Sequence, residues 1–284
     1  MPHLLSALLY ALLAIYFWRS SWQTQSLHPA AELSGGANTT TSRRAQWESG
    51  LLAIPLCLQG WGLYAAIYRA DGTYFSFALA LALMMWLAVL IYWLENFRVR
   101  MNGLQALVLP LAAISAVLPA LVEARYIVHA NTFKFQIHLL SAMLAYSLFA
   151  LAAIHAVFMG LSERALHGSP ANRHFAHLIT SLPPLLSMEA VLFRMLWIGF
   201  VLLTISLGTG ILFAEEVFGR ALRFDHKTVF AFISWGIFAV LLAGRHFYGW
   251  RGRQALRLTL AGFLALMLAY IGTRFVLEVI LGRV

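Results

Sequence analysis

Long apolar runs dominate the chain, and short polar segments rich in arginine separate them. A membrane helix needs roughly 20 apolar residues to cross about 30 Å of hydrocarbon, and eight runs reach or approach that length. Because lipid admits only helices or closed barrels, and because these runs do not alternate, they predict helices. The predicted spans are 4–19, 50–68, 74–95, 103–122, 136–160, 191–214, 228–244 and 255–281. The pattern therefore predicts one all-α membrane domain over residues 1–284, a polytopic bundle of about eight spans.

Composition supports a membrane location. Of the 284 residues, 61% are hydrophobic and 11% are charged, whereas soluble domains have about 45–50% apolar and about 25% charged residues. The net charge of +9 does not indicate nucleic acid, because the arginines lie in short loops between apolar runs. The single cysteine, Cys57, excludes a disulfide framework and a C-x-x-C redox pair.

Basic residues predict the orientation, with both termini outside. The loops that would then lie inside hold eleven arginines, and the outside segments hold seven basic residues. The two long inner segments would be 20–48, which is polar and resembles a flexible connector, and 161–190. The first run has no basic segment before it and no clear cleavage site after it, so we expect a retained helix, with a cleaved signal peptide as the alternative.

The loop 215–227 has an unusual composition for a membrane connector. It mixes acidic, basic and aromatic residues with His226 at the edge of the membrane. That mixture suits a flat, partly charged ligand. The sequence contains no P-loop, no G-x-S-x-G and no H-E-x-x-H, and no paired catalytic acids or nucleophile with a base can be found. We therefore expect a protein that is not an enzyme.

Two histidines are candidate metal ligands. His138 opens the fifth predicted span at its outer end, and neutral imidazole is a common ligand of haem iron. The alternative is an interfacial histidine that donates to a backbone carbonyl. His226 follows Asp225, which could orient its ring or cap the seventh helix. His155 lies 17 residues beyond His138, or roughly 25 Å along a helix, and cannot share its iron.

Ionisable residues inside the predicted spans are further candidates, because such groups are costly in lipid. Arg194 would begin the sixth span and could extend to the inner surface. Arg274 and Glu278 are four residues apart on the last span and could pair. Alternatively, Arg274 could bind a ligand carboxylate such as a haem propionate.

Residues 183–243 resemble the cytochrome c assembly membrane family, which includes CcsA and CcmC proteins and a HemX/YpjD-like branch. The resemblance is carried by short motifs before, within and after the outer loop: Pro183-Pro184, Glu189, Phe193-Arg194, Gly199-Phe200, Leu203-Thr204, Gly210, Phe213-Ala214, Glu216, Phe218-Gly219, Phe224-Asp225, Lys227 and Trp235. The family loop has the form W-G-x-x-W-x-W-D, and here its tryptophans are replaced by Phe218, Leu222 and Phe224.

Other family positions also differ from the pattern. Expected histidines appear as Gln59, Ala243 and Leu281, which is more similar to the HemX/YpjD-like branch. His138, followed by Ser141 and Tyr146, resembles the outward histidine of the family.

The resemblance implies a multi-pass protein of the bacterial inner membrane that binds haem or assists cytochrome c or haem-pathway assembly. It implies a haem cofactor, with His138 and His226 as iron ligands, Phe218 and Phe224 on the porphyrin face, and Asp225 and Arg274 nearby. The implied partners are membrane lipid, haem, and cytochrome c or haem-biosynthesis proteins. Two alternatives remain open: a transporter of a small hydrophobic or anionic molecule, and an assembly or regulatory scaffold that does not bind haem.

Overall fold

The computed structural model describes residues 2–23, 37–70, 72–97, 104–122, 124–126, 133–167, 185–212 and 226–269. These ranges form eight helices and three short strands. The helices are α1 (Pro2–Gln23), α3 (Ala37–Ile67), α4 (Phe77–Asn96), α5 (Gln105–Leu121), α6 (Phe133–His167), α8 (Leu185–Leu212), α10 (His226–Tyr248) and α11 (Gly252–Met267). The strands are β1 (Tyr68–Arg69), β2 (Gly72–Phe75) and β3 (Arg125–Tyr126).

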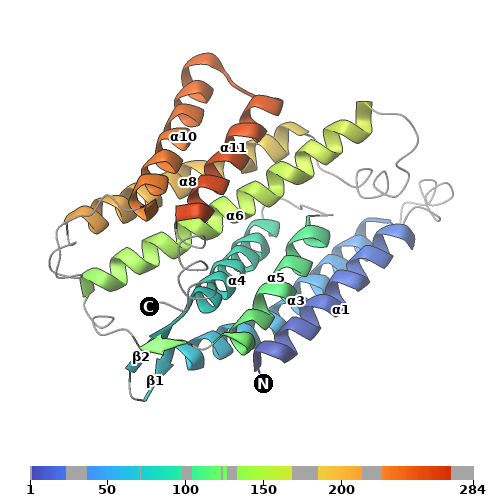
Figure 1. Ribbon diagram of the computed structural model, residues 1–284. Helices are drawn as coiled ribbons and strands as arrows, with labels where there is room; N and C mark the ends of the chain where they lie inside the picture. The colour runs from blue at the N-terminus through green and yellow to red at the C-terminus, as the bar shows by residue number, and fades with distance from the viewer. Residues whose placement is uncertain are drawn as a thin grey trace.

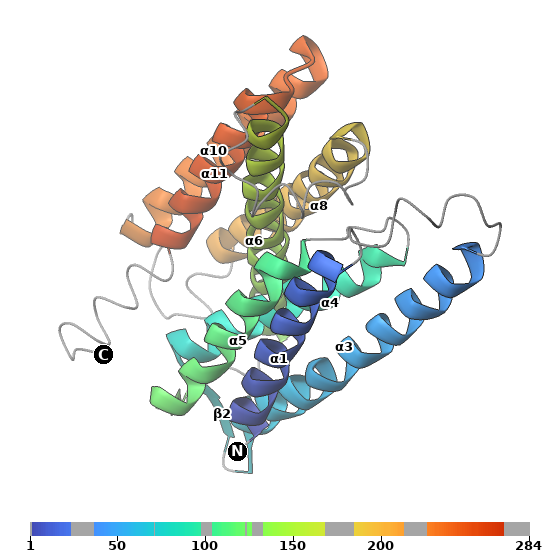
Figure 2. The same cartoon turned by 90° about the vertical axis from the view of Figure 1, so that its right-hand side faces the viewer.

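Helix α6 lies at the centre of the bundle. It packs against α8 most extensively and also contacts α4, α5 and α11. Figures 1 and 2 show α1, α3, α4 and α5 on one side of α6, and α10 and α11 on the other. One continuous apolar core joins the two sides, with Tyr92 of α4, Phe149 of α6 and Phe238 of α10 among its fully buried side chains.

Six helices in the described ranges are long and apolar enough to cross a membrane: Pro2–Arg19, Trp47–Ile67, Phe77–Asn96, Phe133–Arg164, Leu185–Leu212 and His226–Tyr248. Each coincides with a predicted span. Helix α5, the fourth predicted span, is apolar but only 17 residues long. Helix α11 begins the eighth predicted span and ends at Met267, and residues 270–281 of that prediction lie outside the described part of the chain. The all-α polytopic architecture is thus confirmed, with six helices in the described ranges that are long and apolar enough to span a membrane.

The three strands form a small antiparallel sheet that the hydrophobic pattern did not predict. Their order is β1-β2-β3, with Tyr68 opposite Thr73 and Tyr74 opposite Tyr126. The prediction that residues 74 and 75 begin a helix was therefore wrong. Helix α4 begins only after Ser76, whose side chain accepts a hydrogen bond from the Leu79 N–H at 3.2 Å. This side-chain cap fixes the start of the helix because it satisfies one of the first free N–H groups.

The two predicted inner segments are shorter than the sequence suggested. Residues 37–48 belong to α3, so much of the predicted connector 20–48 is helical. Helix α6 continues to His167 and α8 already begins at Leu185, so both ends of the predicted segment 161–190 are helical as well. These helix extensions were not predicted because they contain many polar residues. A helix that continues beyond the membrane no longer needs an apolar surface.

Glycines on two helices allow close contacts with aromatic rings of neighbouring helices. A Cβ atom at Gly199 of α8 would lie 3.1 Å from Cζ of Phe149 on α6. The Phe149 ring in turn stacks on Phe238 of α10, with 3.8 Å between ring centroids. A Cβ atom at Gly262 of α11 would lie 2.8 Å from Cζ of Phe238. These glycines let α8 and α11 approach the same aromatic pair.

Candidate functional site

His138 lies on the first turns of α6 and faces the last turns of α8. Its Nδ1 atom is 3.0 Å from the backbone oxygen of Ser206 and 3.2 Å from Oγ1 of Thr209. The side chain is half-buried. The Ser141 hydroxyl, one turn further along α6, donates to the His138 carbonyl oxygen at 3.0 Å. The ring is therefore held by the contact between α6 and α8.

These bonds determine which ring nitrogen is available. A carbonyl oxygen only accepts hydrogen bonds, so the contact with Ser206 requires the proton to be on Nδ1. In the neutral ring, Nε2 then carries the lone pair. Metal-bound histidines commonly donate their other ring N–H to a backbone carbonyl in this way. The sequence left open whether His138 is a ligand or an interfacial donor to a carbonyl. The donation is present, and it leaves Nε2 available as a ligand atom.

Glycines shape the surface of α8 beside this histidine. A Cβ atom at Gly210 would lie 3.2 Å from Cε1 of His138, so a larger residue there would press on the ring. At Gly208, no heavy atom of the described residues lies within 4 Å of the corresponding position. Gly210 thus allows α8 to pack closely against the imidazole.

The first residues of α10 are the next part of the structure that acts on His138. Lys227, the second residue of α10, is close enough for its charge to act on the His138 imidazole. His226 is the first residue of α10, and its side chain is exposed. The histidine thus lies beside the last turns of α8, and the charge of Lys227 acts on it from the first turn of α10. Four further predicted site residues, Phe218, Phe224, Asp225 and Arg274, lie outside the described ranges.

An aromatic contact joins α8 and α10 next to this region, and sequence reasoning did not single it out as part of a site. The indole Nε1 of Trp235 donates to Oγ1 of Thr204 at 3.0 Å. The Trp235 ring stacks on Phe200, with 5.5 Å between centroids. Thr204 and Thr209 are five residues apart on α8, or about 7.5 Å along the axis. Five residues also turn a helix by about 140°, so Trp235 contacts a different side of α8 from His138.

His155 occupies a different part of α6, as the 17-residue separation predicted. It is fully buried, and its Nε2 atom is 2.9 Å from the Met188 carbonyl oxygen at the start of α8. His138 and His155 thus each anchor α6 to α8, one near the end of α8 and one near its beginning. Their shared use of backbone carbonyls of α8 was not predictable, because backbone oxygens carry no sequence signal.

At the opposite end of the bundle, ion pairs join α4, α6, α8, α10, α11 and the turn between α10 and α11. Arg194 was expected to begin a span and extend to the inner surface. Instead it is the tenth residue of α8, and its guanidinium pairs with Glu95 at the end of α4. The Glu95 side chain is only 11% exposed, whereas that of Arg194 is 40% exposed. The pair connects α4 with α8.

Replacing Glu95 with glutamine is expected to lower the stability of the folded protein by about 1–3 kcal/mol, because a partly buried guanidinium loses its charged acceptor. Arg194→Gln should lower the stability by a similar amount, because the Glu95 carboxylate then loses its charged donor. The double variant should be more stable than the sum of the two losses predicts, because neither charge remains unpaired. Thermal unfolding of the detergent-purified variants measures this. Strictly additive losses would show that the two residues act independently.

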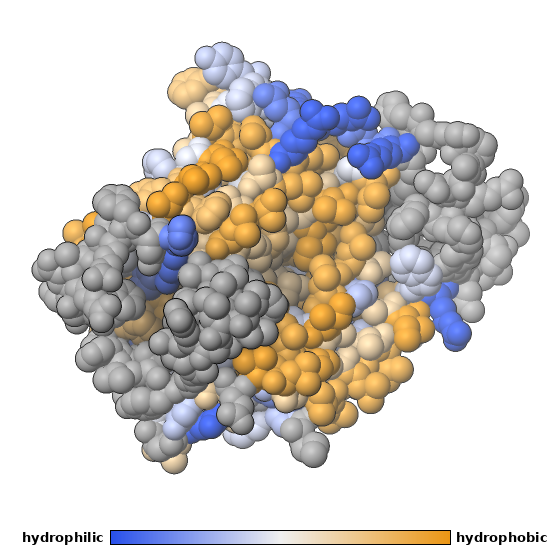
Figure 3. Space-filling model, in the orientation of Figure 1, coloured by the Kyte–Doolittle hydropathy of each residue, from blue (hydrophilic) through white to orange (hydrophobic). Residues whose placement is uncertain are grey.

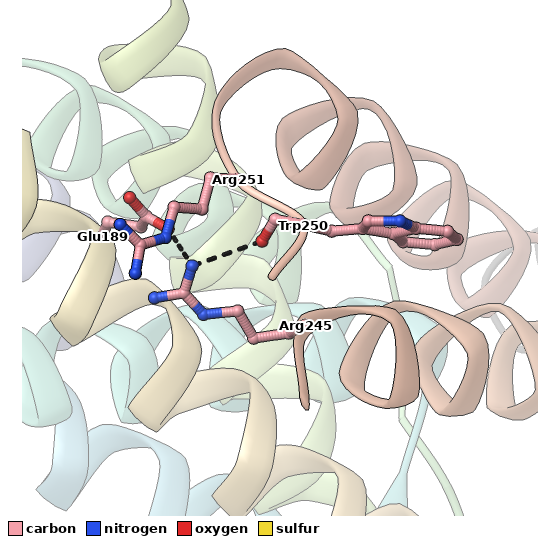
Figure 4. A network of polar contacts seen from close by, with 4 residues as sticks. All are labelled: Glu189, Arg245, Trp250 and Arg251. Atoms are coloured by element: carbon pink, nitrogen blue, oxygen red, sulfur yellow. Dashed lines mark hydrogen bonds and ion pairs between the residues drawn. The ribbon is translucent and has the colours of Figure 1, made fainter. Parts of the chain in front are cut away.

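Glu189, near the start of α8, is the centre of a second ionic cluster. Its Oε1 atom accepts a hydrogen bond from Nη1 of Arg245 at 2.6 Å, and Nε of Arg251 lies 3.8 Å away. The same Nη1 atom donates to the Trp250 carbonyl oxygen at 3.3 Å. Figure 4 shows the two arginine side chains converging on Glu189, while the Trp250 indole extends away from them. The carboxylate therefore fixes the turn that follows α10.

The turn itself depends on glycines. Gly249 has φ +66° and Gly252 has φ +57°, values that are costly for other residues. Between them, the Trp250 N–H donates to the Gly244 carbonyl oxygen at 3.2 Å. The Trp250 ring lies against Gly244, where a Cβ atom would be 2.6 Å from Cζ3. The Gly-Trp-Arg-Gly-Arg sequence at 249–253 is thus a compact turn that is tied to α8.

The described residues contain no group of three or more histidine, cysteine, aspartate or glutamate side chains that could hold a metal ion. A bare metal ion would therefore find too few protein ligands in this part of the chain. Iron in a porphyrin differs, because the macrocycle provides four nitrogens and the protein needs to supply only axial ligands. A single oriented histidine such as His138 fits that requirement.

The fold and these contacts define a multi-pass membrane protein with an oriented histidine at one end and ionic clusters at the other. Residues 56–281 match the family described as cytochrome C assembly protein, and the chain belongs to that family. The resemblance found in the sequence is thereby confirmed.

Two relatives illustrate the range of the family. The chain is 31% identical to the inner membrane protein YpjD of Escherichia coli strain K12 over 170 residues, which are 60% of this chain and 62% of that protein. It is 39% identical to the cytochrome c biogenesis protein CcsA of Prochlorococcus marinus over 88 residues, 31% of this chain and 28% of that protein. The matches thus span less than two thirds of either relative. The chain is a multi-pass membrane protein by the length and composition of its helices, and its relative YpjD is named as an inner membrane protein.

Proposed function

We propose that this protein binds haem where His138 meets the end of α8, and that it assists the assembly of cytochrome c without chemistry of its own. The observation that carries the proposal is the bond from Nδ1 of His138 to the Ser206 carbonyl oxygen, at 3.0 Å. It fixes the tautomer and ring orientation that an iron ligand requires. Membership of the cytochrome C assembly family supplies the biological context.

The neighbouring residues support a flat, partly anionic ligand. Gly210 allows α8 to pack directly on the imidazole, which holds the ring in place. Lys227 provides a positive charge close to His138, and propionate groups are anionic. In this proposal His138 is the first candidate to hold the iron, and His226 is the second candidate.

The loop 213–225 joins α8 to α10 at this same end. We propose that Phe218 and Phe224 pack on the porphyrin face there, and that Asp225 and Arg274 contribute polar contacts. Phenylalanine keeps the flat apolar surface of the tryptophans in the family pattern but lacks the indole N–H, so it can stack without donating a hydrogen bond. The site would then hold haem mainly through the iron and through stacking.

An absorption spectrum tests the proposal directly. The detergent-purified protein should show a Soret band, either as isolated or after titration with haem, and reduction should shift that band. A titration that ends at one haem per chain would support a single site. Absence of any protein-dependent band at saturating haem would refute haem binding. It would favour the alternative of an assembly or regulatory scaffold that does not bind haem.

The assembly role has a separate readout. Membranes of a strain that lacks this protein should contain less covalently bound haem in their c-type cytochromes than membranes of the complemented strain. Haem staining after denaturing electrophoresis measures this. Normal cytochrome c levels together with a positive Soret titration would keep haem binding but overturn the proposed role in cytochrome c assembly.

A further inference from the structure

A groove between α6 and α11 is separate from the His138 region. Its volume is about 430 Å³, within the range of roughly 300–1,000 Å³ that is typical of ligand clefts. Its lining comes from the last turns of α6 and the first turns of α11. It therefore opens at the end of the bundle that carries the ionic clusters, not at the end that carries His138.

The lining changes character along the helices. On α6, the lining residues Ala156, Gly160 and Arg164 are spaced four residues apart, so they share one face of the helix. Arg164 is the one nearest the C-terminal end of α6. On α11, Arg253 and Arg257 lie on the turns nearest the helix start, and Leu260 follows one turn deeper. At 1.5 Å per residue, the stretch from Ala156 to Arg164 is about 12 Å long. The groove is thus apolar inside and basic at its mouth.

The charge at the mouth is strongly positive. Three arginines and one glutamate, Glu163, line the groove. Nε of Arg253 donates to Oε1 of Glu163 at 3.2 Å, which uses one of the five N–H donors of the guanidinium. The Arg253 side chain remains 67% exposed. Arg164 and Arg257 are also exposed. Figure 3 shows hydrophilic residues gathered at the upper right, over the ends of α6 and α11, above a hydrophobic surface.

This combination matches the chemistry of one class of ligand. An apolar floor accommodates an acyl chain, and several guanidinium groups at the membrane edge bind a phosphate through paired N–H donors. Basic pockets between membrane helices on the cytoplasmic side bind anionic lipid headgroups. The excess of arginines in the loops at this end predicts that it faces the cytoplasm.

We infer that the α6–α11 groove binds an anionic phospholipid of the inner leaflet, with its acyl chain against Ala156, Gly160 and Leu256 and its phosphate between Arg164, Arg253 and Arg257. The Glu163–Arg253 bond holds α6 and α11 together at the mouth. Gly160 keeps the floor open, since a Cβ atom there would already be in contact with Leu256, 3.7 Å from its Cδ1. The bound lipid would add a further connection between the two helices.

Native mass spectrometry of the whole protein in a neutral detergent tests this inference. The probes are phosphatidylglycerol, phosphatidylcholine with the same acyl chains, and inorganic phosphate. Phosphatidylglycerol should bind at one site at least about tenfold more tightly than phosphatidylcholine, because each arginine near the surface strengthens attraction to anionic lipid. Inorganic phosphate should not compete, because it lacks an acyl chain. Equal affinity for the two lipids, or displacement by inorganic phosphate, would overturn the inference.

Variants locate the binding site. The triple variant R164Q/R253Q/R257Q should lose the preference for phosphatidylglycerol. R251Q removes a charge at the same end of the bundle but outside the groove lining, so it should retain that preference. If R251Q lost the preference for phosphatidylglycerol as fully as the triple variant, the preference would come from the overall positive charge of this end. That result would refute the groove as the binding site.

Gly160→Leu gives a second, independent test, because it fills the floor and leaves every charge in place. It should weaken phosphatidylglycerol binding at least about tenfold, while the Soret titration described above stays unchanged. Unaltered lipid affinity in a folded Gly160→Leu protein would exclude the floor as the acyl-chain site. The haem proposal does not depend on either outcome, because His138 lies at the other end of α6.

Discussion

His138→Ala is expected to remove the haem Soret band, or to weaken haem binding by at least about 10–100-fold, which is the loss typical when even an outer partner of a metal-bound histidine is removed. The reason is that Nδ1 is already engaged by the Ser206 carbonyl oxygen, so Nε2 is the ring nitrogen that would bind the iron of the proposed haem. Haem titrations of the wild type and the variant, followed in the oxidised and reduced states, measure the effect.

Two further variants show whether the ring itself is the ligand. His246→Ala removes an exposed histidine at the opposite end of α10 and should leave the spectrum unchanged. His138→Gly should recover a Soret band when imidazole is added, because the free ligand can occupy the space of the lost ring. A wild-type spectrum in His138→Ala would eliminate this residue as the ligand and leave His226 as the remaining candidate.

Gly244→Ala is expected to destabilise the protein by about 1–3 kcal/mol, the usual cost of forcing a methyl group into a packed contact. The added Cβ atom would lie 2.6 Å from Cζ3 of Trp250. Two hydrogen bonds restrict movement of the Trp250 backbone away from this contact. Its N–H is bound to Gly244, and its carbonyl oxygen accepts from Arg245. Displacing Trp250 would therefore also disturb the Arg245–Glu189 ion pair. Thermal unfolding in detergent measures the loss.

Gly236→Ala is the matched control on the same helix. No heavy atom of the described residues lies within 4 Å of the position of its Cβ atom. Alanine is favoured over glycine inside a helix by roughly 0.5–1 kcal/mol, so this variant should be neutral or slightly more stable. In the Gly244→Ala background, Trp250→Leu should recover part of the loss, because the smaller side chain leaves room. Equal stabilities of Gly244→Ala and Gly236→Ala would show that Trp250 does not need the glycine.

The hydrophobic pattern determined the membrane architecture. Six of the eight predicted spans correspond to helices long enough to cross the bilayer, because an apolar run of that length has only one stable conformation in lipid. Where the chain leaves the lipid, this constraint ends. The residues of β2 and the helical turns at 37–48 and 161–167 were accordingly missed.

The candidate site was only partly accessible to sequence reasoning. The sequence singled out His138 because of its place at the end of an apolar run, and the motifs around the outer loop indicated the family. The Ser206 carbonyl was not predictable as its partner, since backbone oxygens carry no sequence signal and the two residues are 68 positions apart. The relation of His138 to Lys227 likewise depends on how α6, α8 and α10 pack.

By itself, the sequence determined that this chain is a multi-pass membrane protein of the cytochrome C assembly family, because apolar length and short motifs are local properties. Tertiary structure decided which charges meet. Arg194 pairs with Glu95 across 99 residues, and Glu189 meets Arg245 across 56. It also decided that the arginines of α6 and α11 border one groove. Such contacts depend on the relative positions of helices, which are set by the packing of the whole core and not by any single segment.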